Sequence, residues 1–303
     1  MDRADFCAEM SAVAGEPIFA TAVQVDVWIC LEYRAPWKSK ALADNVLPAA
    51  VKDWLQQTVE QLAGVGLKAR PQFIKRASRG ADAPLHLFVA RNDAVGSVVW
   101  QFNAMDYDAY LDLDVLTLLQ DEVAFEGYRR EEPLFLVCTN GKRDRCCASL
   151  GMPVYTRFAE LAPEATWQTT HLGGHRFAAT LQVLPDAICY GRVGVDDVPE
   201  IIAAQAEHRL LVEHLRGSTA QAPEVQAADY FLRREEGLDR LVDLQFDGVS
   251  RDGEATVVRF LKGVTGDRRT VTVAEDRTDI VIPTSCGDET AKPVTSYKLV
   301  ALG

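Results

Sequence analysis

Residues 134–147 read LFLVCTNGKRDRCC, and the class of fold can be inferred by working outward from them. Four apolar residues run without a break into Cys138, which is typical of a β-strand covered on both faces. A polar loop follows over residues 139–145 and ends at two adjacent cysteines, Cys146 and Cys147. Cys138 therefore stands at the carboxyl end of a central strand, the edge at which open α/β sheets hold their ligands.

The segments after this stretch complete an α/β unit. Spacing of apolar residues predicts a helix over 154–161, and alternation predicts a strand over 165–170. Strands over 180–184 and 187–193 flank the turn signal Pro185-Asp186. A long helix is expected over 199–216, with Gly217 as its stop. With the strand over 134–137, the order of elements is β-α-β-β-β-α.

The residues that precede Leu134 are expected to form elements in the same order, β-α-β-β-β-α. The expected elements are strands over 22–33, 68–74, 85–90 and 97–103, with helices over 47–62 and 110–119. No sequence repeat accompanies the repeated order of elements. That order suits a sheet of four strands flanked by helices, so we expect an α/β fold with two thioredoxin-like units in tandem.

The last part of the chain has a different pattern. A helix over 225–241 precedes short strands that Gly and Asp residues separate, and these predict a small C-terminal antiparallel β segment. The expected strands are 243–248, 255–261, 270–274, 279–282 and 296–302. The chain would divide into residues 1–130, 131–220 and 221–303.

Length and charge limit the classes of protein. The chain has 303 residues, which suggests two or three domains. Its net charge of −12 disfavours nucleic acid as a partner, because phosphate backbones would repel it. No uncharged stretch is long enough to cross a membrane, and the acidic N-terminus does not resemble a targeting signal. We therefore expect a cytoplasmic protein without membrane contact, in which seven cysteines are not a disulfide framework.

A second motif, His171-Leu-Gly-Gly-His175, follows the strand expected over 165–170. Two thiolates and two imidazoles at one sheet edge would form a donor set that suits zinc or an iron–sulfur centre. Eight residues separate Cys138 from Cys147, and 23 separate Cys147 from His171, so the spacing is not that of a zinc finger. A cysteine loop this wide is better suited to an object as large as a two-iron cluster.

These motifs resemble the sucrase/ferredoxin-like family, a branch of the thioredoxin-like ferredoxins. The matching text is VCTNGKRDRCC, then HLGGHRFA, then YGRV at residues 190–193. The resemblance implies a 2Fe–2S cluster held by Cys138, Cys147, His171 and His175. Cys146 is an alternative to Cys147 as the second thiolate ligand, and Asn140 stands where many bacterial members have histidine.

The implied function is one-electron transfer between redox partner proteins, a reductase and an unknown acceptor. Two neutral imidazoles in place of thiolates raise the potential, to roughly −150 to +300 mV in Rieske centres against about −400 mV with four cysteines. Each histidine keeps a second ring nitrogen for a proton, so a pH-dependent potential is expected. Arg176 and Arg192 would tune the nearby charge, and Arg143 and Arg145 would do the same or form a docking rim. The acidic surface suits a basic reductase face.

Two alternatives remain open from the residues alone. One is a zinc-stabilised interaction module, and the other is a thiol–disulfide oxidoreductase that uses Cys146 and Cys147. No nucleotide-binding, hydrolase or metalloprotease motif is present, so an electron carrier is favoured over a catalyst. Cys30 is interpreted as a buried small hydrophobe, which leaves the first unit without a cluster. Cys7, Cys189 and Cys286 are interpreted as a terminal, a core and a loop thiol.

Overall fold

The computed structural model describes residues 6–76, 80, 82–93, 97–263 and 265–303. Ten strands form one curled sheet in the order β10-β9-β8-β6-β7-β2-β1-β3-β4-β5. The leading strands are β1 (Val27–Glu32) and β6 (Leu134–Cys138). The other eight are β2 (Ala69–Lys75), β3 (Leu85–Arg91), β4 (Val98–Ala104), β5 (Arg129–Arg130), β7 (Thr166–Thr169), β8 (Leu181–Leu184), β9 (Ile188–Tyr190) and β10 (Leu215–Ser218).

The sheet consists of two halves with the same topology. In the first half β1 pairs parallel to β2 and antiparallel to β3, which pairs with β4. In the second half β6 pairs parallel to β7 and antiparallel to β8, which pairs with β9. The edge strands β2 and β7 join the halves by an antiparallel pairing. The expected α/β fold, two thioredoxin-like units in tandem, is confirmed.

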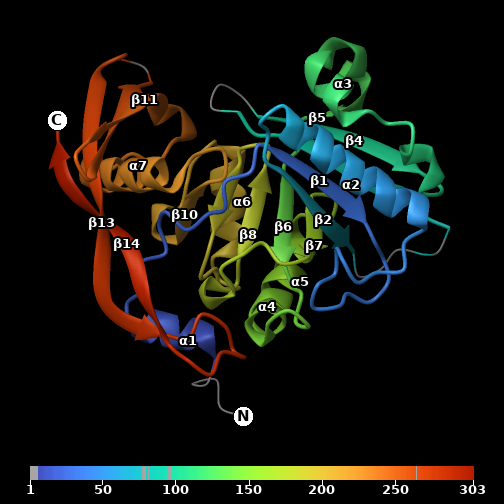
Figure 1. Cartoon of the computed structure of the whole chain (residues 1–303), viewed down its shortest axis with the longest axis horizontal. Coiled ribbons are helices and arrows are strands. Elements are labelled where there is room, and N and C mark those ends of the chain that lie inside the picture. The colour runs from blue at the N-terminus through green and yellow to red at the C-terminus, as the bar shows by residue number, and fades with distance from the viewer. Residues whose placement is uncertain (1–5, 77–79, 81, 94–96, 264) are drawn as a thin grey trace.

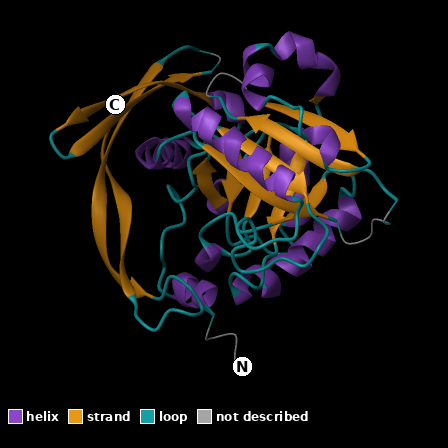
Figure 2. Cartoon of the chain, turned by 45° about the vertical axis from the view of Figure 1, so that its right-hand side comes forward, coloured by secondary structure: helices purple, strands orange, loops and turns teal. Residues whose placement is uncertain are grey.

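Helices cover the outer face of each half (Figures 1 and 2). In the first half α2 (Ala49–Gly64) and α3 (Val115–Gln120) pack on alternate residues of β1, such as Ile29. In the second half α5 (Gly151–Leu161) and α6 (Val198–Ala206) pack on alternate residues of β6, such as Val137. The short helix α4 (Arg145–Ser149) precedes α5.

The inner face of the curled sheet forms a core that both halves share. Trp28 and Cys30 of β1 lie in the same cluster as Leu136 and Cys138 of β6. The ring of Trp167 meets those of His86 and Phe88 at centroid distances of 5.1 and 5.5 Å, which joins the halves directly. Cys138 therefore lies at one end of an apolar layer that excludes water.

The C-terminal part adds a second sheet and a helix. Four antiparallel strands follow the order β11-β12-β13-β14, and α7 (Pro223–Glu236) packs on them. The strands are β11 (Leu244–Asp252), β12 (Ala255–Lys262), β13 (Arg268–Ile282) and β14 (Lys292–Leu302). The hairpin of β13 and β14 reaches α1 (Cys7–Val13), at the other end of the chain (Figure 1). The predicted antiparallel β segment is confirmed, although the strands expected over 270–274 and 279–282 form a single strand.

Several expected elements differ in extent. The helix over 225–241 ends at Glu236, where Gly237 adopts a left-handed conformation, and the strand over 187–193 ends at Tyr190. The helix over 199–216 is wrong beyond Ala206, because Leu215–Ser218 forms β10 and buried Arg216 bonds to Thr21 and Gly173. Gly217 is therefore not a helix stop; it pairs with Cys189 at a φ of +138°. The helix over 110–119 begins only at Val115, where the Asp114 side chain caps it. The strand over 22–33 begins at Val27, because the backbone before it bonds outside the ladder: the Val25 amide donates to the Thr219 carbonyl.

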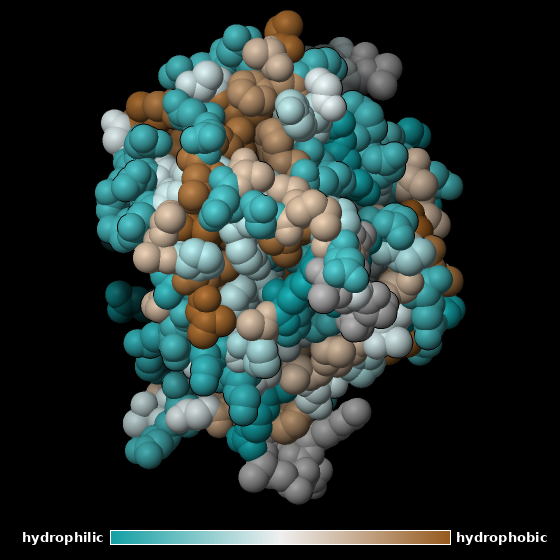
Figure 3. Space-filling view, turned by 90° about the vertical axis from the view of Figure 1, so that its right-hand side faces the viewer, coloured by the Kyte–Doolittle hydropathy of each residue, from teal (hydrophilic) through white to brown (hydrophobic). Residues whose placement is uncertain are grey.

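The face of the molecule shown in Figure 3 is mainly hydrophilic. On the face shown in Figure 3, apolar residues gather in broken strips among hydrophilic ones. Over the described residues, no helix combines the length and apolar character needed to cross a membrane.

Candidate metal centre

Cys138 and Cys147 come from the strand and the helix that flank the polar loop. Cys138 is the last residue of β6, and its amide donates to the Thr180 carbonyl at 3.0 Å. Cys147 lies in α4, which begins where Asp144 accepts the Cys146 amide at 2.9 Å. Each of the two cysteines is only 1% exposed. Cys138 thus has the expected position, at the carboxyl end of a central strand.

The two histidines lie on the loop that follows β7. Gly173 and Gly174, between them, have φ values of +97° and +68°, a conformation that favours glycine. A Cβ on Gly174 would also lie 2.6 Å from a guanidinium nitrogen of Arg216. Arg216 is buried and donates to the Gly173 carbonyl at 2.9 Å, so it fixes the course of this loop.

The structure brings three of the four predicted ligands together. The sulfur atoms of Cys138 and Cys147 and a ring nitrogen of His171 all lie within 4.8 Å of one another. Cys147 Sγ is 3.9 Å from His171 Nδ1. His175 lies beside this group rather than in it: its ring centroid is 5.0 Å from that of His171, and its Nε2 is 3.6 Å from Asp144 Oδ2.

The ring nitrogens of His175 are only weakly engaged by the protein. Both of its ring nitrogens are buried, and within the described part of the chain neither makes a close, well-aligned hydrogen bond; the polar groups beside them are the Thr284 backbone and Asp144. Burial lowers the pKa of His175, with a smaller opposing effect from Asp144, so the neutral ring is favoured. Neutral imidazole is the form that binds metals. Buried polar atoms without close partners are rare and call for an explanation, which a bound metal would supply.

The two thiols of the site titrate as a pair. A hydrogen bond from the Cys147 thiol lowers the pKa of Cys138 well below its usual value, and His171 and the Leu172 amide act in the same direction. The same contact with Cys138 raises the pKa of Cys147, and burial raises it further. Cys138 is therefore the sulfur that becomes a thiolate first, and thiolates are the metal-binding form of cysteine.

These residues fit the implied iron–sulfur group in their chemistry. The set holds two buried sulfurs and two imidazoles, a soft-to-borderline donor set. A Cβ on Gly151, the first residue of α5, would collide with the Cys138 carbonyl oxygen. This close approach of α5 to the end of β6 holds Cys138 in place.

Cys146 faces away from this group. Its sulfur lies 3.2 Å from that of Cys286 and 3.5 Å from that of Cys7, and all seven cysteines are free thiols. The interpretation of Cys7 as a terminal thiol and Cys286 as a loop thiol missed this convergence. The spacing of the cysteines in the sequence does not predict this convergence, because the contacts span 139 and 140 residues. Since Cys146 and Cys147 face different groups, the geometry does not favour a redox pair of the two.

The arginines expected near the site have other partners. Arg176 pairs with Glu16 at 2.7 Å, and Arg192 donates to the Ser11 and Glu16 carbonyls, so both anchor the N-terminal segment. Arg145 is exposed and donates to the Cys286 carbonyl at 3.3 Å. Sequence reasoning missed Arg70, which donates to the His171 carbonyl at 2.9 Å.

An open cavity adjoins the site on the His171 side. It has a volume of about 550 Å³, and the basic residues that line it with His171 are Lys40, Lys68, Arg70 and Arg143. The local charge is therefore positive, although the whole chain carries −12. This cavity is the place at which the site is open to another molecule.

Within its described residues, the first half offers no comparable donor set. Cys30 is fully buried among apolar residues, and burial raises its pKa to about 12. Among the residues that the structure describes, no group of three potential metal donors includes Cys30. His86, interpreted as a core histidine, is buried with its Nδ1 3.0 Å from Glu32.

Comparisons with known proteins agree with the motifs. One relative is "Altered inheritance of mitochondria protein 32" of Meyerozyma guilliermondii, 27% identical over 103 residues, or 31% of this chain. The match spans 36% of that relative, well under two thirds of its length. A solved structure, a cysteine-to-serine variant of the thioredoxin-like [2Fe-2S] ferredoxin from Aquifex aeolicus, matches at 22% identity and a TM-score of 0.22. That match covers 25% of this chain and 88% of the ferredoxin. Residues 18–217, about two thirds of the chain, match the model of the family described as Sucrase/ferredoxin-like, and the chain belongs to that family.

Proposed function

We propose that this protein is a one-electron carrier in which Cys138, Cys147, His171 and His175 hold a single 2Fe–2S cluster. The observation that carries the proposal is the buried convergence of two thiols and His171 at the end of β6. The buried ring nitrogens of the adjacent His175, which make no close, well-aligned hydrogen bond within the described residues, support a fourth donor. When bound, such a cluster accepts and returns one electron, and its two imidazole ligands place its potential above that of all-cysteine centres.

The surrounding residues can hold a proton beside the site. Asp144 Oδ2 lies 3.6 Å from His175 Nε2. Burial by itself would raise the pKa of Asp144, but hydrogen bonds from the amides of Cys286 and Cys146 outweigh it and lower the pKa to about 2. The carboxylate is therefore ionised at neutral pH and favours a proton on His175 Nε2. We infer that gain of an electron at this site is coupled to gain of a proton there.

Docking of a redox partner would use the cavity beside His171. Its rim carries Lys40, Lys68, Arg70 and Arg143, so the partner face expected there is acidic. This proposal is the opposite of the expectation from net charge, which pointed to a basic reductase face. Association with an acidic partner should weaken as ionic strength rises, because salt screens exposed charges.

A potential measured as a function of pH tests the proposal. In the wild type the midpoint potential should fall as pH rises, since reduction takes up a proton. His171→Cys and His175→Cys should each lower the potential and weaken its pH dependence, because a thiolate adds negative charge and removes the ring nitrogen. Cys30→Ala, which removes a buried thiol that belongs to neither donor group, serves as the control and should leave both quantities unchanged. A wild-type potential independent of pH would contradict proton coupling, and iron-free protein holding zinc in this site would favour the interaction module instead.

A further inference from the structure

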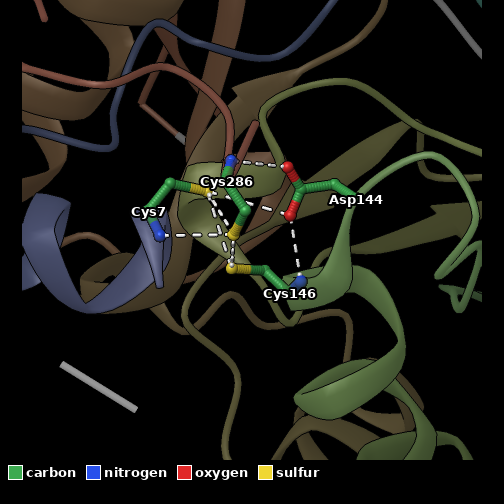
Figure 4. Close-up of side chains that lie close together, drawn as sticks. All are labelled: Cys7, Asp144, Cys146 and Cys286. Atoms are coloured by element: carbon green, nitrogen blue, oxygen red, sulfur yellow. Dashed lines mark hydrogen bonds between the residues drawn. The ribbon is translucent and has the colours of Figure 1, made fainter. Parts of the chain in front are cut away.

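A second group of potential ligands meets at the start of α4, next to the first group. Cys7, Asp144, Cys146 and Cys286 each offer one atom, and all four atoms lie within 4.8 Å of one another (Figure 4). Cys7 comes from α1, Asp144 and Cys146 from the start of α4, and Cys286 from the loop between β13 and β14. Three segments distant in the chain thus meet at one point.

The sulfur separations agree with a shared metal ion. The three distances are 3.5 Å for Cys7 to Cys146, 3.2 Å for Cys146 to Cys286 and 3.6 Å for Cys7 to Cys286. A disulfide has its sulfurs about 2.0 Å apart and joins two cysteines, so it cannot account for a triangle of three. Tetrahedral zinc with Zn–S distances of about 2.3 Å places its sulfurs about 3.8 Å apart, close to the separations seen here.

Most of this second group is shielded from solvent, and only Cys286 is half-buried. Cys7 and Cys146 are 1% and 0% exposed, and apolar residues such as Ala8, Leu150 and Ala178 pack around them. Backbone amides face the sulfurs: that of Cys7 donates to Cys286 Sγ at 3.4 Å, and that of Ala8 bonds to Cys146. Two buried thiols and one half-buried thiol, with amide donors around them, are arranged as in a sheltered structural metal site.

Asp144 supplies an oxygen at the fourth corner. Its Oδ1 lies 3.9 Å from Cys7 Sγ, and its Oδ2 accepts from the Cys286 amide and the Ser285 hydroxyl, each at 2.9 Å. These bonds fix the carboxylate between α4 and the hairpin loop. The same Oδ2 is 3.6 Å from His175, so Asp144 lies between the two donor groups.

We propose that Cys7, Cys146 and Cys286, with Asp144 as the fourth ligand, bind one structural Zn²⁺ ion. Three soft thiolates and one carboxylate in a buried four-donor site match zinc better than a hard cation such as Mg²⁺. The ion would fix α1 and the loop between β13 and β14 onto α4, the helix that also carries Cys147. This site uses none of the four residues assigned to the iron–sulfur cluster, but it shares Asp144 with the proton site proposed beside His175.

Metal analysis of the full chain tests the site. Protein purified under reducing conditions and supplied with Zn²⁺ should hold one zinc ion that a weak chelator does not remove. Cys7→Ala and Cys286→Ala should each weaken zinc binding at least tenfold in competition with a chromophoric chelator. Their iron and sulfide content should stay at the wild-type level. Cys30→Ala, which removes a buried thiol outside both groups, is the matched control and should keep the zinc.

A second measurement needs only the wild type and covers the case in which a variant does not fold. Zinc-loaded protein is treated with an alkylating reagent, and each cysteine is then read by peptide mass spectrometry. Cys7, Cys146 and Cys286 should be protected together and become reactive together when zinc is removed. Zinc retained at wild-type affinity by both variants would overturn the proposal. The proposal would also be overturned if zinc were lost only from the His171→Ala variant. A disulfide between two of the three cysteines in reduced, zinc-supplied protein would overturn it as well.

Discussion

In the first half of the large sheet the leading strand ends at Glu32, and in the second half it ends at Cys138. The strands around these two positions pair in the same way, parallel to the next strand and antiparallel to the one after it. In the first half the polar groups pair with one another: Glu32 accepts from Arg34 at 2.7 Å and lies 3.0 Å from His86.

The second half keeps its donors available instead. Cys138 and Cys147 form a thiol pair beside His171, and the ring nitrogens of His175 are buried without close, well-aligned hydrogen bonds in the described residues. One topology therefore supports an ion-paired end in one half and, in the other, a group of residues that could hold a metal. The function follows from the residues at the strand ends and not from the fold.

Removal of the leading thiol should have the largest effect. Cys138→Ala should abolish iron binding altogether, because it removes the sulfur whose lowered pKa favours the thiolate. Cys30→Ala in the first half should leave iron and sulfide content unchanged and cost about 1 kcal/mol of stability through lost packing. Iron and sulfide assays with chemical unfolding measure both. Equal iron loss in the two variants would remove the distinction between the halves.

A glycine-to-alanine substitution made in one helix of each half tests the difference between the two halves. Gly151→Ala in α5 places a methyl group against the Cys138 carbonyl oxygen and should cost roughly 1–3 kcal/mol, with partial loss of iron. Gly64→Ala in α2 meets no atom within 4 Å and should stabilise the protein by about 0.5–1 kcal/mol. Gly151→Ala should therefore lower both the urea unfolding midpoint and the iron content. Gly64→Ala should raise the midpoint without lowering the iron content. A Gly151→Ala protein as stable and iron-rich as the wild type would contradict the role given to this close approach.

The ion-paired end of the first half predicts a smaller effect that depends on pH. Burial opposes ionisation of Glu32, but bonds from His86 and Arg34 outweigh it and lower the pKa from its usual 4.5. A carboxylate with a lowered folded-state pKa stabilises the fold above its unfolded pKa, and this contribution is lost as pH falls through the folded value. The stability difference between wild type and Glu32→Gln should thus shrink below about pH 4.5. A difference that stays constant or grows in acid would refute the ion-paired interpretation.

Local patterns predicted most of the elements and the position of Cys138. The strands before Cys138 and His171 could be predicted because an apolar run and an alternating pattern each involve only neighbouring residues. The helix over 199–216 was overextended because apolar spacing does not show that Arg216 is buried against Thr21 and Gly173. The meeting of Cys7, Cys146 and Cys286 depends on how the chain ends pack on α4, and no local pattern encodes that.

The central claim is tested most directly by a visible absorption spectrum of anaerobically purified protein, with iron, sulfide and zinc assayed on the same sample. Charge-transfer bands with two irons and two sulfides per chain are the result predicted here, together with one zinc ion that Cys7→Ala removes without bleaching the bands. A colourless protein that binds zinc through Cys138, Cys147 and the two histidines would contradict the electron-transfer account.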